Sequence, residues 1–452
     1  MGGTTHHDAG ELSASRGFLG HPVGLGYLSL AYSFERFAFY GMQSLLALYM
    51  LGSVLRPDHA PHVWGLATAR ASLGAGSDQA LASGIYGVYI GLCYLTPLLG
   101  GFIADRLVGR TPTIVAGAIL LVAGHALMAV EAAFFPALLL LLIGIGFMKG
   151  NVATQIGSLY AADDLRRTDA FQIFVGMFQI AGILAPLVCG TLGEKVSWHY
   201  GFVAADVSMV ISLLLYLATL RHIPRDPPPA RNLPGRAKLT ADERRTVLVL
   251  IAMLPLLALA TMPNDQIYNA YIVWGERSFD RHFFGMDAPA SWLGSIDTFV
   301  AVIMSALVLI FWRWRAHRRP DPDEITKVMI GAWFTAAGPL VLALGAALAG
   351  HGKISLLWAV LFELLDCTGT GMLYAIGMSL YSRAAPRPVA GLIIGIFYLH
   401  LVLSNFLVGW VGGWLGAMPD TLFWLAHTGL SGLGAAGLVV MRSLFRRRLA
   451  PV

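Results

Sequence analysis

Hydrophobic residues are gathered into long runs that short polar segments separate. A run of about 20 apolar residues is long enough for a helix to cross the hydrocarbon core of a bilayer. The pattern therefore predicts twelve membrane-spanning helices. They cover residues 25–54, 82–105, 112–131, 134–160, 170–193, 200–220, 246–273, 290–312, 327–349, 354–382, 388–415 and 420–441.

A polar segment after the sixth run divides these helices into two sets of six. It covers residues 221–245 and holds five prolines and seven Lys or Arg residues, a composition that gives an extended linker. The predicted parts are an N-terminal tail (1–24), a first bundle (25–220), the linker (221–245), a second bundle (246–441) and a basic tail (442–452). Two six-helix halves joined in this way are typical of transporters with a binding site at the membrane midplane.

Composition and charge support a membrane protein. Hydrophobic residues make up 56% of the chain and charged residues 13%, against about 25% charged residues in soluble domains. With the N-terminus inside, 23 of the 31 Lys and Arg residues fall in cytoplasmic tails and loops and six in outer loops. This bias predicts that both termini are cytoplasmic, and it explains the net charge of +5 without a nucleic-acid surface.

Other classes of protein have little support in the sequence. The three cysteines lie in apolar runs, which leaves no disulfide framework and no metal-ligand spacing. Motifs of zinc proteases, serine hydrolases and phosphate-binding loops are missing, so we expect no enzyme, no cofactor and no metal. A receptor that does not transport would have the same sequence features, and only a flux measurement separates it from a transporter.

Charged residues inside the apolar runs are the first functional candidates. Glu35 and Arg36 stand side by side in the first run, and Lys149 stands alone in the fourth. A charge at membrane depth costs about 2.5–3.5 kcal/mol even on lenient scales, so these side chains should face a watery cavity or each other. A transport pathway is therefore the leading interpretation, and a purely structural buried pair is the alternative.

The loop after the second run contains the sequence GGFIADRLVGR at residues 100–110. It resembles the signature of the major facilitator superfamily, in which Asp and Arg side chains hold helix ends together on the cytoplasmic side and glycines allow close helix approach. The resemblance implies a cytoplasmic gate motif made by Gly101, Asp105, Arg106, Gly109 and Arg110. An ordinary basic inside loop is the alternative interpretation.

Further motifs resemble one family of that superfamily. Residues 34–42 (FERFAFYGM) are similar to the helix-one motif of the proton-dependent oligopeptide transporters, the POT family. Similar stretches follow in order at 94–101 (YLTPLLGG), 144–151 (GIGFMKGN), 171–174 (FQIF), 185–190 (APLVCG) and 198–202 (WHYGF). In the second half the resemblance thins to 265–266, 291–292 and the region of the tenth and eleventh helices. It implies an all-α major facilitator fold of twelve helices.

The resemblance also implies roles for single residues. Arg36, Tyr40 and Lys149 are expected to hold the carboxylate of a peptide, and a guanidinium can do so with two parallel hydrogen bonds. Lys149 is expected to pair with Asp265 across the two halves, and Glu35 to take a proton during the cycle. The hydroxyls of Tyr40 and Tyr94 are expected to contact the peptide backbone, with simple packing as an equally good interpretation. Gln179 aligns with an asparagine that helps to hold the peptide amine.

The chain departs from the family pattern at several of these positions. Tyr32 stands where the family has an acidic residue that is implicated in proton coupling, and Gln43 replaces an arginine. The glutamate of the tenth helix, which receives the peptide ammonium, aligns with Thr370. Asp297 stands in an amine-facing position, so we expect the ammonium counter-charge to lie at Asp297, with Asp366 as second choice.

These features predict a proton-coupled symporter of di- and tripeptides or peptide-like compounds that works by alternating access. The expected partners are the peptide-like substrate, protons and membrane lipid, with no nucleic acid. The expected state is a monomer in a bacterial inner membrane. The alternative is the same fold carrying another organic anion, or a facilitator or exporter that is not coupled to protons.

Overall fold

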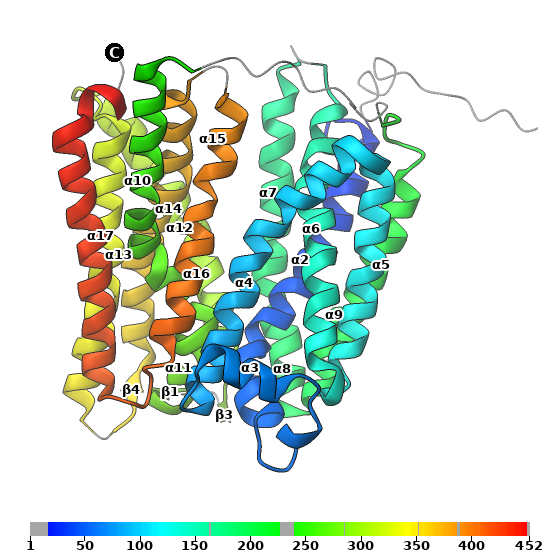
Figure 1. Cartoon of the computed structure of the whole chain (residues 1–452), viewed down its shortest axis with the longest axis vertical. Coiled ribbons are helices and arrows are strands. Elements are labelled where there is room, and N and C mark those ends of the chain that lie inside the picture. Colours follow the sequence, from blue (N-terminus) through cyan, green and yellow to red (C-terminus); the bar gives the residue numbers. More distant parts are fainter. Residues whose placement is uncertain are drawn as a thin grey trace, which may run out of the picture. The chain divides into compact units, whose positions relative to one another are not determined.

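The computed structural model describes residues 17–161, 164–226, 239–283, 285–350, 352–386 and 389–449. Residues 1–16, 227–238 and 450–452, which belong to the predicted tails and linker, lie outside this range. Twelve helices of the described residues are long and apolar enough to cross a membrane, which confirms the predicted number. Figure 1 shows these helices.

The chain forms two compact units, which are described separately. The first comprises Met1–Leu45, Asp58–Gly65 and Leu95–Leu233, and the second Leu46–Pro57, Leu66–Tyr94 and Pro234–Val452. The helix α4 (Asp78–Ile103) therefore contributes residues 78–94 to the second unit and 95–103 to the first. The bundle boundaries drawn from the sequence place all of this helix in the first bundle, and they stay a prediction.

The first unit consists of helices and short helical turns. They are α2 (Val23–Tyr49, whose last four residues group with the second unit), η2 (Ala60–His62), η3 (Ala104–Val108), α5 (Arg110–Met128), η4 (Glu131–Ala133), α6 (Phe134–Ser158), α7 (Arg166–Ala185), η5 (Pro186–Gly190), α8 (Thr191–Lys195) and α9 (Trp198–Thr219). Two serines of α9 hold α2 through its backbone. The hydroxyl of Ser208 donates to Phe34 O (2.7 Å), and that of Ser212 donates to Ala31 O (2.6 Å). These bonds fix the turn of α2 that carries Glu35 and Arg36.

The second unit contains the remaining helices and four two-residue strands. The helices are η1 (Met50–Val54), α3 (Leu66–Leu73), α10 (Ala241–Asp265), η6 (Ile267–Tyr271), α11 (Ile272–Ser278), α12 (Trp292–Ala316), α13 (Glu324–Ala349), α14 (Leu356–Ala384), α15 (Ala390–Phe397), α16 (Leu399–Gly412) and α17 (Asp420–Leu449). Strand β1 (Phe279–Asp280) pairs in parallel with β4 (Ile354–Ser355), and β2 (His282–Phe283) is antiparallel to β3 (Met286–Asp287). Helix α13 packs against α14 and α17, as Figure 1 shows.

Helix α10 begins at Ala241, inside the predicted linker, because the sequence there forms a capping box. The hydroxyl of Thr240 accepts the backbone N–H of Glu243 (3.2 Å), and the Glu243 carboxylate accepts the backbone N–H of Thr240 (2.8 Å). These two bonds satisfy donors that a helix start otherwise leaves unpaired. Hydropathy alone does not detect such a start, because the first turn of the helix is polar.

A break after α10 sets the direction of the chain near Asp265, the last residue of that helix. Asn269 has a non-helical backbone, with φ −119° and ψ −108°. The Gln266 side chain accepts a hydrogen bond from Asn269 Nδ2 (2.8 Å), and its Nε2 atom lies 3.0 Å from Nε2 of His427 on α17. These buried polar contacts make the break a fixed feature of the second unit, and it positions Asp265 and Tyr271.

Helix α17 extends beyond the predicted end at residue 441 and has a kink at Phe445 (φ −125°, ψ 18°), and side chains on both sides of this kink pair with the start of α13. The N-cap residue Asp323 accepts hydrogen bonds from the backbone N–H of Thr326 (3.0 Å) and from Arg446 Nε (3.0 Å). Burial on its own raises the pKa of the Asp323 carboxyl. The bonds from Thr326 and Arg446, with the nearby charge of Arg442, outweigh burial and hold that pKa below its usual value.

In the first unit, α4 and α6 pack at almost backbone distance beside the predicted gate motif. A Cβ atom added to Gly100 would lie 2.0 Å from Gly146 O, whereas a Cβ atom on the neighbouring Gly101 would meet nothing within 4 Å. Of the two adjacent glycines, Gly100 therefore permits the close approach. The family signature names Gly101 instead.

This difference gives a stability prediction with a built-in control. Gly100→Ala should destabilise the protein by about 1–3 kcal/mol, because the new methyl group would overlap the backbone carbonyl of Gly146 and the two helices would have to move apart. Gly101→Ala should be neutral or stabilising by up to about 1 kcal/mol, the usual gain of Ala over Gly in a helix. Apparent melting temperatures in detergent measure both variants. Equal shifts for the two would show that the close contact is not present.

Candidate functional site

Glu35 and Arg36 form a buried ion pair on α2. Arg36 Nε donates to Glu35 Oε2 at 2.6 Å, and Arg36 Nη2 donates to the other carboxylate oxygen, so the pairing is bidentate. The exposed fractions of the two residues are 1% and 4%. Neighbouring residues of a helix do not face each other, so the pair depends on the length of the arginine side chain.

Aromatic rings enclose the guanidinium of Arg36. Its central carbon lies 5.0 Å from the centre of the Tyr32 ring and 4.6 Å from that of Phe39, within the range of cation–π attraction. Tyr32 also packs against two rings of α7, Phe174 at 4.8 Å and Phe178 at 5.7 Å. The tyrosine at the position of the expected acid thus covers the arginine instead of neutralising it.

Four further residues predicted to bind substrate, Tyr40, Lys149, Gln179 and Tyr94, are half-buried. Tyr40 is on α2, with its ring 5.7 Å from that of Phe39. Lys149 is on α6, and Gln179 is on α7, directly after Phe178. Tyr94 is half-buried on the part of α4 that belongs to the second unit, where it lies in electrostatic range of Tyr374.

Acidic side chains gather in the second unit. Asp265 is half-buried at the end of α10, and its Oδ2 atom accepts a hydrogen bond from the Ser404 hydroxyl of α16 at 2.5 Å. Asp366 on α14 is fully buried and accepts from Asn264 Nδ2 at 2.9 Å. The Thr370 hydroxyl donates to the backbone oxygen of Asp366 (2.9 Å), so this threonine is bound to its own helix.

A third acidic group connects α12 and α14. The thiol of Cys367 lies 3.5 Å from Asp297 Oδ1 and 3.9 Å from Glu363 Oε2. Glu363 is fully buried and Asp297 is half-buried. Glu363 was not among the residues singled out in the sequence, although the signal was present, because it is a carboxylate inside the predicted helix 354–382. The same argument that selected Lys149 applies to it.

The two units therefore differ in the charge that they offer. The first presents Arg36 and Lys149. In the second, Asp265 accepts from a hydroxyl and Asp366 from an amide, while Asp297 contacts a thiol and shares a hydrogen bond with the Glu363 carboxyl group. Buried carboxylates are stabilised by a proton, a cationic ligand or a metal ion when no basic side chain neutralises them. The carboxylates of the second unit therefore favour a proton or a cation, whereas in the first unit Glu35 already neutralises Arg36.

The structure brings together several residues of the predicted gate motif. Arg110 Nη2 donates to Asp105 Oδ1 at 3.0 Å, and the Arg106 guanidinium lies 5.8 Å from the ring of Phe102. Gly109 has φ +91°, a left-handed conformation that favours glycine, at the turn between η3 and α5. Two residues later, the backbone N–H of Thr111 donates to Asp226 Oδ2 (2.6 Å). The role of these residues as a gate stays a prediction.

Comparison with known proteins identifies the family. The sequence profile described as POT family matches residues 111–240 and 231–419, more than half of the chain. The chain belongs to the POT family. The "Di-/tripeptide transporter" of Lactococcus lactis subsp. cremoris is 27% identical over 94% of this chain and 95% of its own length.

Solved structures of POT family transporters share the fold. A peptide transporter in complex with sulfate superposes with a TM-score of 0.85 at 22% identity and covers 99% of this chain and 100% of its own. A POT family transporter in complex with 5-aminolevulinic acid superposes with a TM-score of 0.79 at 22% identity and covers 94% and 97% of the two chains. The predicted family and the all-α major facilitator fold are confirmed.

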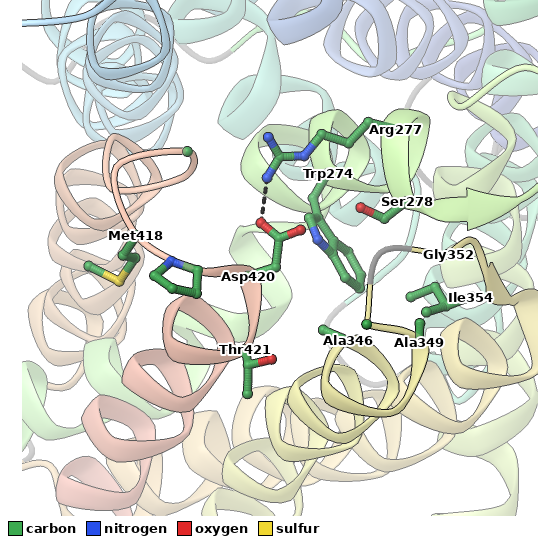
Figure 2. Close-up of a pocket in the computed structure, with 13 residues that line it drawn as sticks. Trp274, Arg277, Ser278, Ala346, Ala349, Gly352, Ile354, Met418, Asp420 and Thr421 are labelled. Carbon is green, nitrogen blue, oxygen red and sulfur yellow. Dashed lines mark hydrogen bonds and ion pairs between the residues drawn. The ribbon is translucent and has the colours of Figure 1, made fainter.

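This POT family member also has an open cavity of about 420 Å³ in its second unit, at the ends of α11, α13 and α17. Figure 2 shows the ion pair at its rim, where Arg277 Nη2 lies 2.5 Å from Asp420 Oδ1. The lining includes Trp274, Ile354 and Met418 but none of the predicted binding residues. The predicted binding residues therefore lie outside this cavity.

Proposed function

We propose that this POT family member is a proton-coupled symporter of di- and tripeptides or peptide-like compounds that works by alternating access. One observation carries the proposal. A buried arginine in the first unit complements the carboxylate end of a peptide, and a buried group of carboxylates in the second unit complements the amine end. The names of relatives and solved neighbours support this choice of substrate, since they include a di-/tripeptide transporter and a complex with 5-aminolevulinic acid.

The carboxylate end is assigned to Arg36, with Lys149 and Tyr40 beside it. Arg36 already makes two parallel hydrogen bonds to Glu35. An incoming carboxylate offers the same geometry, so Arg36 can exchange one bidentate partner for another. Glu35 is then released and takes a proton, which avoids leaving an unpaired charge in a buried place.

The amine end is assigned to Asp297 together with Glu363. The Asp297 position was expected from the sequence, and the structure adds a glutamate beside it through Cys367. Asp366 is the weaker candidate, because one of its oxygens already accepts the amide of Asn264. Gln179 and Thr370 are kept as neutral polar contacts, and Tyr94 as a hydroxyl for the peptide backbone.

The driving force is assigned to protons at Glu35 and Asp265, with Lys149 as the partner of Asp265. A membrane potential of 100 mV supplies about 2.3 kcal/mol per charge, enough for roughly fifty-fold accumulation. We place both termini in the cytoplasm because of the 23 to 6 distribution of Lys and Arg between inner and outer loops. The proposed location is a bacterial inner membrane, and the proposed state is a monomer.

The test is uptake of labelled dialanine into proteoliposomes with and without an inward proton gradient. We expect uptake that needs the gradient and falls to the background of empty liposomes in Lys149→Ala. A variant with a cation outside the assigned site, Lys353→Ala, should transport like the original protein. Absence of dialanine flux in both conditions would contradict the peptide proposal and favour an organic anion without an amine.

A second candidate function, a facilitator or exporter without proton coupling, is favoured by one observation. Tyr32 occupies the position of the expected acid and stacks on Arg36. Under this alternative, dialanine flux is present but unchanged by the proton gradient, and Tyr32→Glu should introduce gradient dependence. The same proteoliposome assay therefore separates the two functions.

A further inference from the structure

Three different donor atoms converge in the second unit. They are a carboxylate oxygen of Asp297, a carboxylate oxygen of Glu363 and the sulfur of Cys367, and all lie within 4.8 Å of one another. Glu363 and Cys367 are one helical turn apart on α14, while Asp297 comes from α12. Asp297 is the partly exposed member, so it is the side from which an ion can enter.

A fourth polar group, from η6, lies at this cluster. The phenol of Tyr271 is fully buried and lies beside Glu363, with Asp297 and Cys367 also in its electrostatic range. Its hydroxyl lies in hydrogen-bonding range of the Glu363 carboxyl group, and the second carboxylate oxygen, Glu363 Oε1, is buried with no hydrogen-bond partner among the described residues. The ring is fixed by Phe362, whose centre is 4.9 Å away. A buried carboxylate oxygen without a hydrogen-bond partner, beside a second carboxylate and a thiol, marks a place that a ligand completes.

We propose that a divalent transition-metal ion of the zinc class binds at Asp297, Glu363 and Cys367. Around a tetrahedral zinc ion with bonds of about 2.0–2.3 Å, neighbouring ligand atoms lie about 3.5 Å apart. The sulfur–oxygen distances here are 3.5 and 3.9 Å, so small side-chain movements suffice. The thiolate selects zinc-like ions over Mg²⁺ and Ca²⁺, which prefer oxygen alone.

Binding requires the ligands to be deprotonated, and no electron is transferred. The ion displaces the thiol proton of Cys367 and any proton held by the two carboxyl groups, and these protons leave to water. Tyr271 or a water molecule takes the fourth position. If the amine end of the substrate binds at Asp297 and Glu363, which rests on the proposed function, then the metal and the peptide compete for the same oxygens.

Cobalt reports on this site directly, without any transport measurement. The purified full chain, with any affinity tag removed, is titrated with Co²⁺, and we expect the near-ultraviolet thiolate-to-cobalt absorption, which Zn²⁺ then abolishes. Cys367→Ser should remove the band. The matched control is Cys189→Ser, a second buried cysteine, which lies in the first unit and should leave the band unchanged. A band that survives in Cys367→Ser, or is absent from the original protein, overturns the proposal.

A second variant guards against misfolding of Cys367→Ser. Asp297→Asn keeps the thiol and the shape of the side chain, and it should weaken Co²⁺ binding at least tenfold while the melting temperature without metal stays close to that of the original protein. In proteoliposomes, Zn²⁺ should inhibit dialanine uptake by the original protein and by Cys189→Ser but not by Cys367→Ser. If cobalt binds but zinc does not inhibit uptake, the metal site is upheld and competition between the metal ion and the peptide is overturned. Absence of uptake in all samples contradicts only the proposed function.

Discussion

Asp297→Asn should lower the affinity for dialanine by about 30-fold or more, and Glu363→Gln should have a similar effect. Removing one partner of a buried charge pair costs about 2–5 kcal/mol, and every 1.4 kcal/mol is tenfold in affinity. Both side chains are placed at one thiol in the second unit, so the ammonium that they receive is left partly unpaired in either variant. Binding to the purified protein, measured by calorimetry, checks the prediction.

The ligand itself supplies the control for this prediction. N-acetyl-dialanine has no ammonium, so its affinity should be low and should change little in Asp297→Asn. Asp366→Asn tests the weaker candidate and should change the dialanine affinity less than Asp297→Asn, because one of the Asp366 oxygens already accepts an amide. Unchanged dialanine affinity in both Asp297→Asn and Glu363→Gln would show that the amine does not bind there.

Arg36→Gln should reduce dialanine uptake by about 100-fold or more and should also destabilise the protein. The uptake falls because glutamine cannot make the charge-assisted, bidentate contact to a carboxylate. The stability falls by about 3–5 kcal/mol, because the buried Glu35 is left as an unpaired charge. Uptake in proteoliposomes and melting temperatures in detergent measure the two effects separately.

A double variant distinguishes the two roles of Arg36. Glu35→Gln together with Arg36→Gln removes both buried charges, so stability should return while dialanine uptake stays lost. Recovery of uptake in the double variant would mean that Arg36 serves only to neutralise Glu35. Arg36→Lys keeps the charge but lacks the planar fork, so it should bind dialanine more weakly than the original protein and more strongly than Arg36→Gln.

The number of spanning helices could be predicted because bilayer thickness sets the length of an apolar run. The ends of the helices were harder to predict from the sequence, since they depend on polar contacts. The capping box at Thr240 and the pairing of Arg446 with Asp323 extend α10 and α17 beyond the hydrophobic segments. The break at Asn269 is held by Gln266 and by a contact to His427 of α17, a residue distant in the sequence.

The candidate site could be predicted only in part for a similar reason. A charge inside an apolar run is visible in one dimension, which is why Glu35, Arg36 and Lys149 were singled out, whereas Asp265 came only from the family resemblance. Which of several polar residues on α14 meets α12 depends on the rotation of both helices, and hydropathy does not determine rotation. Alignment drew attention to Thr370, whereas the structure places Glu363 and Cys367 at Asp297.

Hydrogen bonds hold both Asp226 and Thr240, the two ends of the segment that connects α9 to α10. Asp226 accepts the N–H of Thr111 at the start of α5, and Thr240 closes its capping box with Glu243 on α10. Loop-closure entropy grows slowly with the length of a connection, and each doubling costs only about 0.6 kcal/mol. A fluorescent reporter or a protease recognition sequence can therefore be inserted after Asp226, or the polypeptide can be produced as two co-expressed fragments, with both helix starts preserved.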